Sequence, residues 1–406
     1  MSAESPLGNS GHGATAPSLR ICIAYDRLYP WSIGGAERWY RRLAEELARE
    51  GHLVTYLTTR QWCAGDEPDI AGVQVVSIAP DDALYGRGRR RLIPVLRFGL
   101  ALWWRLLRRG RDYDVVHAPA LSSWSALAAG SLARPRRYRL VLDWWEVWTW
   151  AYWRTYLGTG AGAAAWLMQR QTAKLRHEPI AFSTLHARRL ESLRRRRDVR
   201  TVLGVLATSK PLSVPRQAEP LVVYAGRFVP EKQVPSIVAA LAKARDRLPT
   251  LRAVLIGEGP DLEAVRQAVR SARLDRAVDL PGFVSEKTLM ETLGRAMCLV
   301  LLSRREGYGL IVAEAAALGV PSVILRHADS AAADLIVEGV NGFTCASTDP
   351  TEVASAILRV YEAGGDLRHA TLAWFHTNAG TLSIEGPLSR ILDAYRGLPA
   401  EENTGA

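Results

Sequence analysis

Cysteine is scarce in this chain, and the four cysteines lie far apart. Cys22, Cys63, Cys298 and Cys345 have no spacing that fits a metal site. Cys22 and Cys298 fall in short apolar segments that are typical of buried strands, so we expect free thiols rather than disulfide bonds. This usage predicts a protein of a reducing compartment, the cytoplasm.

Long hydrophobic runs are also missing. No apolar run reaches the roughly 18 residues that a membrane-spanning helix needs. The first 18 residues are small and polar, without the basic start and apolar middle of a secretory signal. We interpret residues 1–18 as a disordered tail, and we expect neither a transmembrane helix nor a signal peptide.

Acidic residues are scarce in the first half only. Up to Leu206 the chain has 31 basic and 18 acidic residues, whereas the rest has 21 basic and 23 acidic ones. Twelve of the 13 tryptophans lie between Trp31 and Trp166. A basic, tryptophan-rich half followed by a near-neutral half predicts two domains with different partners.

Short apolar segments alternate with helical segments, which is typical of mostly parallel sheets flanked by helices. The first series has expected strands at residues 19–25, 54–58, 73–78, 115–117, 139–142, 180–183 and 201–202. The second has them at 221–225, 253–256, 278–280, 298–302, 322–325 and 342–344, with helices that include 331–338 and 351–363. We predict a tail (1–18), two doubly wound α/β domains (19–205 and 206–375), and a C-terminal helix at about 376–398 that packs back on the first domain.

Turns of the second series carry groups that suit a phosphorylated ligand. Arg227 follows Gly226 after the strand 221–225, and Lys232 follows in the next turn. The guanidinium of Arg227, with its forked donors, and the compact ammonium group of Lys232 can therefore reach one diphosphate. A solvated basic turn would look the same. Gly257-Glu258-Gly259-Pro260 and Gly282-Phe283-Val284 follow the next two strands, and each is a weak signal alone. Their convergence on one sheet edge is the stronger signal.

The stretch Glu306-Gly307-Tyr308-Gly309-Leu310 leads from an apolar strand into a helix. Its glycines allow close approach to a ligand, and a helix N-terminus favours phosphate. Glu314 lies within the apolar helix, where a buried carboxylate needs partners such as sugar hydroxyls. The plain alternative is two surface carboxylates near a helix start. We interpret the stretch as a pocket for a phosphorylated sugar.

These motifs, with Gly34-Gly35-Ala36-Glu37 and Asn341-Gly342, resemble the retaining nucleotide-sugar glycosyltransferases of family four. The resemblance implies the glycosyltransferase B fold, in which two Rossmann-like domains face each other across a cleft. It implies transfer of a sugar from a nucleoside-diphosphate sugar to an acceptor hydroxyl, without a metal ion or other cofactor. Candidate acceptors are small molecules and lipid-linked or cell-envelope glycans. A non-catalytic scaffold of this fold, or an epimerase or hydrolase of the nucleotide sugar, stays open as an alternative.

The resemblance also implies roles for individual residues. Arg227 and Lys232 would neutralise the donor diphosphate, with Glu306 near the donor sugar hydroxyls. The remaining donor contacts would be Gly35 on the diphosphate, Val284 by its backbone on the nucleobase, the amides of Gly307, Tyr308, Gly309 and Leu310 on the sugar and distal phosphate, and Glu314 on the ribose.

One departure from the family concerns a histidine that often faces the reacting centre. The corresponding segment here reads Asp143-Trp144-Trp145-Glu146-Val147-Trp148, so Trp145 occupies its place, and an indole cannot accept a proton. Candidates for an acceptor or proton role are His117, Asp143, Trp145 and Glu146, although a single histidine at a strand end is more often structural. The donor phosphate can itself assist the acceptor proton in this family.

Nine arginines and no acidic residue lie between Arg87 and Arg111, around an apolar segment with Trp103 and Trp104. This pattern predicts an interfacial helix, residues 92–109, that would attract an anionic membrane, making the protein peripheral on the inner face of the cell membrane. A core-facing helix with solvated ends is the alternative. No nucleic-acid partner is expected, because no known binding module is present.

Overall fold

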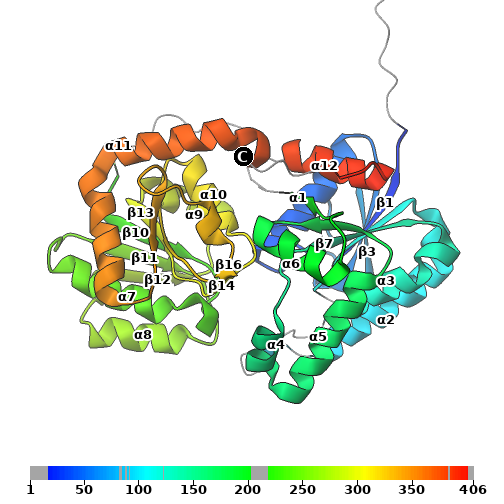
Figure 1. Cartoon of the computed structure of the whole chain (residues 1–406), viewed down its shortest axis with the longest axis horizontal. Coiled ribbons are helices and arrows are strands. Elements are labelled where there is room, and N and C mark those ends of the chain that lie inside the picture. The colour runs from blue at the N-terminus through cyan, green and yellow to red at the C-terminus, as the bar shows by residue number, and fades with distance from the viewer. Residues whose placement is uncertain are drawn as a thin grey trace, which may run out of the picture.

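The computed structural model describes residues 17–81, 85–86, 89–90, 92–121, 123–202, 218–382 and 385–400. Most of the expected tail and of the linker after Leu206 lies outside the described residues. The described chain forms two lobes, each with a parallel sheet covered by helices (Figure 1). The predicted fold class, two Rossmann-like α/β units, is confirmed.

The first lobe has a seven-stranded sheet in the order β3-β2-β1-β6-β7-β8-β9. Its strands are β1 (Arg20–Ala24), β2 (Leu53–Arg60), β3 (Val73–Pro80), β6 (Val115–Pro119), β7 (Arg139–Trp144), β8 (Glu178–Ala181) and β9 (Arg200–Thr201). Its helices are α1 (Gly35–Arg49), α2 (Leu92–Arg109), α3 (Ser123–Arg136), α4 (Trp150–Leu157), α5 (Thr159–Lys174) and α6 (Thr184–Arg194). The central strands β1, β6 and β7 are buried along almost their whole length, because helices cover both faces of the sheet.

The second lobe has a six-stranded sheet in the order β12-β11-β10-β13-β15-β17. Its strands are β10 (Leu221–Ala225), β11 (Arg252–Ile256), β12 (Val278–Gly282), β13 (Cys298–Leu301), β15 (Ser322–Leu325) and β17 (Gly342–Cys345). Its helices are α7 (Val234–Arg245), α8 (Leu262–Ser271), α9 (Glu286–Arg295), α10 (Leu310–Ala317) and the first part of α11 (Pro350–Leu382). A separate pair, β14 (Arg305–Glu306) and β16 (Asp329–Ser330), projects toward the first lobe (Figure 1).

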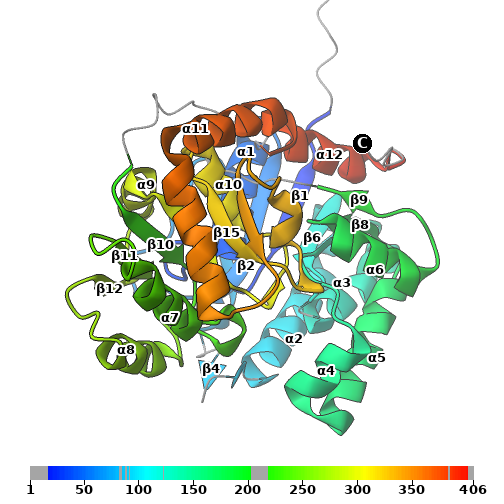
Figure 2. The same ribbon diagram turned by 60° about the vertical axis from the view of Figure 1, so that its left-hand side comes forward.

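Helix α11 connects the lobes. It bends at Gly364, where φ is 54° and ψ is −134°, and then runs over the second lobe toward the first (Figures 1 and 2). Helix α12 (Glu385–Arg396) lies on β7 and β8 of the first lobe, where Ile391 and Ala394 are fully buried. The C-terminal segment therefore ties the two lobes together by packing.

The local structure differs from the expectations in two places. Residues 331–338 form only a short 3₁₀ helix, Ala332–Leu335, because the Asn341 side chain accepts from Val337 N at 2.8 Å and donates to Leu335 O at 2.8 Å. Those backbone groups are then not available to a longer α-helix. The expected helix 351–363 matches the first segment of α11, which ends at the non-helical Gly364, and a second helical segment that was not expected as part of the same element follows it to Leu382. Helix α4 was not expected, since its sequence shows no apolar period.

Among the described residues, no helix has both the length and the apolar character required to cross a bilayer.

Candidate active site at the junction of the lobes

The turns expected to bind phosphate lie together at the carboxyl ends of β10, β11 and β12. A Cβ added to Gly257, whose φ is 141°, would lie 1.9 Å from the carbonyl oxygen of Gly226, so only glycine fits between these turns. Val284 follows β12 at the same edge and is half-buried. The expected nucleotide turns are therefore neighbours in space.

Lys232 ends a 3₁₀ helix (Pro230–Lys232) and reaches the end of β14. Its Nζ forms an ion pair with Oε2 of Glu306, and the two side chains are only 18% and 20% exposed. Arg227 begins the loop that leads from β10 to this 3₁₀ helix, and its carbonyl accepts from the Tyr224 hydroxyl at 2.9 Å. The turn after β10 and the Glu306 turn, which lie far apart in sequence, thus form one charged site.

Two helix N-termini meet beside this site. Gly34 caps α1 and Gly309 caps α10, and neither cap has a side-chain hydrogen bond. Gly309 has a φ of 96°, and a Cβ there would meet the Cβ of Ala332 at 2.9 Å. A Cβ on Gly35 would meet Leu310 Cδ1 at 2.9 Å, so the first turns of the two helices touch across the lobes. Converging N-termini favour an anion between them.

Glu314 is 2% exposed in α10 and is paired with Arg38 of α1. Arg38 Nη1 lies 2.9 Å from Glu314 Oε1, and Nη2 donates to Oε2 at 3.4 Å. Burial raises the pKa of Glu314, and Arg38 offsets only part of that rise. Burial works to lower the pKa of Arg38, but the Glu314 carboxylate more than compensates, so this pKa is raised. Glu314, the residue expected to bind the donor ribose, is therefore already paired with an arginine of the first lobe.

Arg305, just before Glu306, is held by groups from both lobes. Its Nη1 lies 2.7 Å from Oε2 of Glu146 in the first lobe, and its Nη2 lies 3.6 Å from Oε1 of Glu231 in the second. Its guanidinium also stacks over the rings of Trp148 and Tyr152, at 4.3 and 4.9 Å from their centroids. Cation–π contact and two carboxylates fix this cation at the junction.

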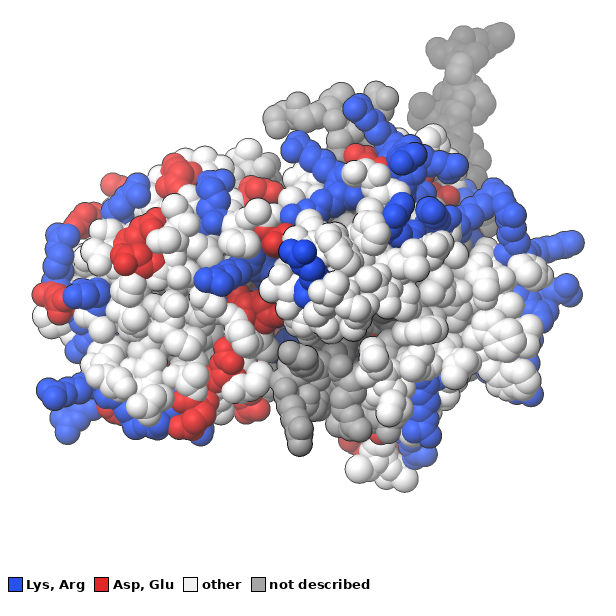
Figure 3. Space-filling model, turned by 60° about the horizontal axis from the view of Figure 1, so that its bottom comes forward, with Lys and Arg blue, Asp and Glu red and all other residues white. Residues whose placement is uncertain are grey.

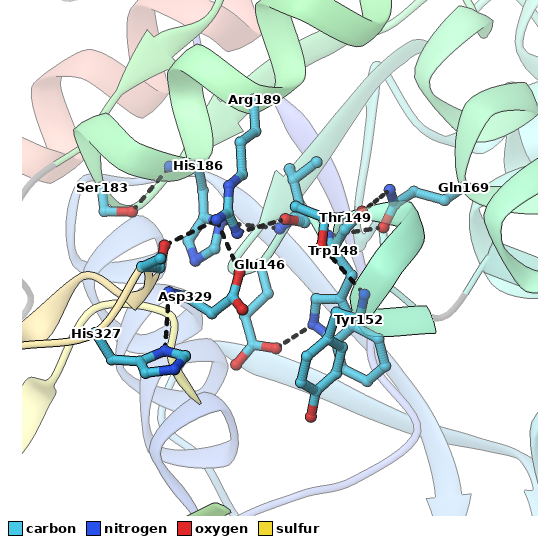
Figure 4. Close-up of polar contacts among 12 residues, drawn as sticks. Glu146, Trp148, Thr149, Tyr152, Gln169, Ser183, His186, Arg189, His327 and Asp329 are labelled. Atoms are coloured by element: carbon cyan, nitrogen blue, oxygen red, sulfur yellow. Dashed lines mark hydrogen bonds and ion pairs between the residues drawn. The ribbon is translucent and has the colours of Figure 1, made fainter. Parts of the chain in front are cut away.

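Glu146 remains ionised in this setting. Burial opposes its charge, but Arg305 and the indole N–H of Trp148 outweigh burial, so the pKa of Glu146 is lowered. Figure 4 shows the carboxylate turned toward Trp148. A general base needs a free lone pair that faces the proton it removes. Arg305 and the Trp148 indole both contact Oε2 of Glu146, which leaves Oε1 for such a role.

A further contact closes the junction from α6. Arg189 donates to Asp329 Oδ1 and to Ala328 O, each at 2.8 Å, and also to Val147 O at 3.3 Å (Figure 4). Beside it, burial lowers the pKa of His186 to about 4, so this imidazole is neutral near pH 7. The lobes are therefore joined by the Arg38–Glu314, Arg305–Glu146 and Arg189–Asp329 pairs, all placed around the Glu306 turn.

Family models match both lobes of the chain. The model described as Glycosyltransferase Family 4 matches residues 33–210, and the one described as Glycosyl transferases group 1 matches residues 209–371. The chain is a glycosyltransferase of the family 4 type. Its fold is the glycosyltransferase B fold of its structural neighbours.

Known glycosyltransferases resemble this one along nearly its full length. Glycogen synthase of Mycobacterium tuberculosis is 26% identical over 371 residues, which cover 85% of this chain and 86% of the relative. Sucrose-phosphate synthase of Thermosynechococcus elongatus has a TM-score of 0.78 at 17% identity, covering 93% of this chain and 98% of its own. HepE of Anabaena, solved with UDP and glucose, has a TM-score of 0.70 at 15% identity, covering 94% of this chain and all of its own (100%).

Two of the proton candidates lie in the core of this glycosyltransferase. His117 and Asp143 are fully buried, and His117 Nε2 lies 2.7 Å from Asp143 Oδ1. His117 Nδ1 lies 2.7 Å from the hydroxyl of Tyr395 in α12, and Trp39 Nε1 donates to Asp143 Oδ2 at 3.3 Å. This arrangement ties α12 to the sheet and leaves both side chains without exposed surface, so we predict a structural role for them.

Trp145 lies at the junction itself. Its ring stacks on Phe182 with centroids 3.7 Å apart and planes 3° from parallel. Its carbonyl oxygen would lie 2.5 Å from a Cβ added to Gly307, so the two lobes are in contact here. The indole thus packs at the junction of the lobes, at the position where the family often has its histidine.

The sequence reasoning missed several residues of this glycosyltransferase. Arg305 and Glu231 directly precede two expected site residues in sequence, and that adjacency was the available signal. Arg38 and Arg189 carry no such signal, because only the docking of the lobes brings them to their partners. The chain also has one Asp-x-Asp motif, residues 112–114, but it lies away from the site, because Asp114 bonds Arg20 at the start of β1 and β6, the opposite edge of the sheet.

Proposed function

We propose that this glycosyltransferase transfers a sugar from a nucleoside-diphosphate donor to an acceptor hydroxyl with retention of configuration and without a metal ion. The observation that carries the proposal is the Lys232–Glu306 pair beside the glycine-capped N-termini of α1 and α10. The pair supplies a cation for phosphate and a carboxylate for sugar hydroxyls, while the N-termini supply amides.

The roles follow from position. Arg227, Lys232 and the amides of residues 307–310 stabilise the departing diphosphate, and Glu306 orients the donor sugar. The bond from the anomeric carbon to the diphosphate breaks, and the bond from that carbon to the acceptor oxygen forms on the same face. The acceptor proton passes to the departing phosphate oxygen, so no histidine is required at the position of Trp145.

Substrate classes follow from the neighbours and the charge. HepE was solved with UDP-glucose, so a UDP-sugar is the first donor to test. WaaG, a glycosyltransferase involved in lipopolysaccharide biosynthesis, has a TM-score of 0.68 at 15% identity, covering 93% of this chain and all of its own (100%). Together with the basic first lobe, this supports a lipid-linked or cell-envelope glycan as the acceptor.

The test combines binding and turnover. A thermal-shift panel of UDP-, GDP-, ADP- and TDP-sugars identifies the donor, because a ligand that binds only the native state raises the melting point. With that donor, Lys232→Ala and Glu306→Ala should each lower release of nucleoside diphosphate by about 10²–10³-fold, the range for loss of one transition-state contact. Lys243→Ala, on the exposed face of α7, is the matched control. Near-normal turnover in both site variants would refute the proposal.

A further inference from the structure

Four consecutive helices of the first lobe carry no acidic residue. Helices α2, α3, α4 and α5 contain nine Lys or Arg and neither Asp nor Glu, although the average of the chain would place about six acids there. α2 packs on α3, and α3 and α4 pack on α5. Figures 1 and 2 show the four helices together at one end of the lobe.

The same helices expose large apolar side chains. On α2, Ile93, Leu100 and Trp104 are 66%, 69% and 49% exposed. Their spacing of seven and then four residues puts them on one face of the helix. That face also carries Arg97 and Arg108, and the Arg108 guanidinium lies 3.9 Å from the centroid of the Trp104 ring. The outer face of α2 is therefore an apolar stripe edged by arginine.

Helix α3 adds a further exposed aromatic side chain next to α2. A Cβ added to Gly99, on the buried side of α2, would lie 3.0 Å from the Cβ of Trp124, so the first turn of α3 packs on α2 at the residue that precedes Leu100. Trp124 is 41% exposed there. Exposed Trp150 of α4 and Leu167 of α5 belong to the same group of helices. Figure 3 shows the first lobe with Lys and Arg among uncharged side chains, and acidic side chains mainly on the second lobe.

We propose that the α2–α3 face, made of Ile93, Arg97, Leu100, Trp104, Arg108 and Trp124, docks the protein onto an anionic lipid bilayer. Tryptophan and aliphatic side chains enter the boundary of headgroups and acyl chains, and arginines contact the phosphates. The charge pattern favours an anionic membrane over a second copy of the chain or a nucleic acid. A second copy would bring two acid-free arginine faces together, and like charges would repel at a self-complementary interface. Nucleic acid would leave the exposed aliphatic side chains without a partner.

The test is sedimentation of the full-length protein with vesicles of phosphatidylcholine, with and without phosphatidylglycerol. The wild-type chain should pellet with the anionic vesicles only, and less at high salt. The double variants Leu100→Glu/Trp104→Glu and Arg97→Glu/Arg108→Glu should each weaken the partition at least about tenfold. Tyr361→Glu, at an equally exposed aromatic on α11, should leave it unchanged.

Two outcomes would overturn the assignment. One is pelleting that is absent from anionic vesicles or equal in the wild type and both double variants. The other is a concentration-dependent dimer, seen in analytical ultracentrifugation, that the double variants abolish. The rise in melting temperature on adding the donor reports whether each variant is folded and still binds the donor, and it should be the same in all the variants.

Discussion

The most demanding prediction concerns the pair that joins α1 to α10. Replacing Arg38 with Met keeps the length of the side chain and removes its charge. Glu314, which is 2% exposed, then loses its cation across the cleft. A buried carboxylate without a partner is costly, so Arg38→Met should destabilise the protein more than the loss of a surface ion pair does.

The magnitude follows from distance and exposure. At 2.9 Å and an effective dielectric constant of about 20, the two charges attract by about 6 kcal/mol before desolvation is subtracted. Removal of one partner of a buried pair costs about 3–5 kcal/mol. The Arg38 side chain is 23% exposed, so water can reach part of the site, and we expect a loss near the lower end, about 3 kcal/mol at pH 8.

The loss should depend on pH, with a defined sign. The folded-state pKa of Glu314 is already raised by burial, so this group binds protons more readily in the folded than in the unfolded chain. Its contribution to stability therefore falls as pH rises through the folded pKa. Without Arg38 the pKa rises further, and the destabilisation at pH 8 should exceed that at pH 5.

Urea unfolding at pH 5 and pH 8, followed by tryptophan fluorescence, measures both quantities. Arg38→Met/Glu314→Gln should recover much of the stability and lose the extra pH dependence, because no buried charge remains. Arg42→Met removes a pair in which Arg42 is 42% exposed, and Glu46 keeps Arg49 as a partner, so the substitution should cost less than about 1 kcal/mol. If Arg38→Met behaves like Arg42→Met at both pH values, the buried-pair reasoning is wrong.

Three further substitutions test the site and its support. His117→Phe removes a hydrogen bond from the buried carboxylate of Asp143 and should lower the free energy of unfolding, measured in urea, by about 2–3 kcal/mol. The folded enzyme should keep its turnover. Loss of turnover with unchanged stability would instead indicate a catalytic role for His117. Gly309→Ala forces alanine to a φ of 96° and should lower the free energy of unfolding by about 1–2 kcal/mol. Gly294→Ala, in open space on α9, should raise it by up to about 1 kcal/mol. Equal effects of the two substitutions would contradict the backbone strain inferred for residue 309. Glu146→Gln weakens the hold on Arg305 and should lower kcat/KM about tenfold in a diphosphate-release assay, and unchanged kinetics would remove Arg305 from the site's architecture.

Much of the fold could be predicted because parallel sheets need apolar strands. β10 and β13 are buried along almost their whole length, and their short apolar runs are visible in the sequence. The expected helix 92–109 matches α2 residue for residue. Failures came where a side chain from outside the segment decided its length, as Asn341 does for the 3₁₀ helix Ala332–Leu335.

The sequence predicted which residues each turn of the second lobe adds to the site, but not the contacts made between the lobes. The sequence places Lys232 and Glu306 at strand ends of one sheet, and the structure shows them in contact. It gives no sign that Arg38 reaches Glu314, a residue 276 positions away, because that contact depends on how two separately folded lobes dock. The same reason explains His117, whose partner Tyr395 is 278 positions away on a helix that returns from the other lobe.

The docking of the lobes has a consequence for the donor. Glu306 and Glu314, the carboxylates expected to hold sugar and ribose hydroxyls, each already have a cation, Lys232 and Arg38 respectively. A donor brings hydroxyl donors for the carboxylates and phosphate oxygens for Lys232, so its binding exchanges partners without leaving a buried charge unpaired. The Lys232–Glu306 pair lies within one lobe and can be exchanged with the cleft closed, whereas the Arg38–Glu314 pair spans both. Separation of the lobes must break Arg38–Glu314 together with Arg305–Glu146 and Arg189–Asp329. Of these three pairs only Arg38–Glu314 includes a carboxylate expected to bind the donor. We therefore expect this pair, and not Lys232–Glu306, to couple donor entry to movement of the lobes.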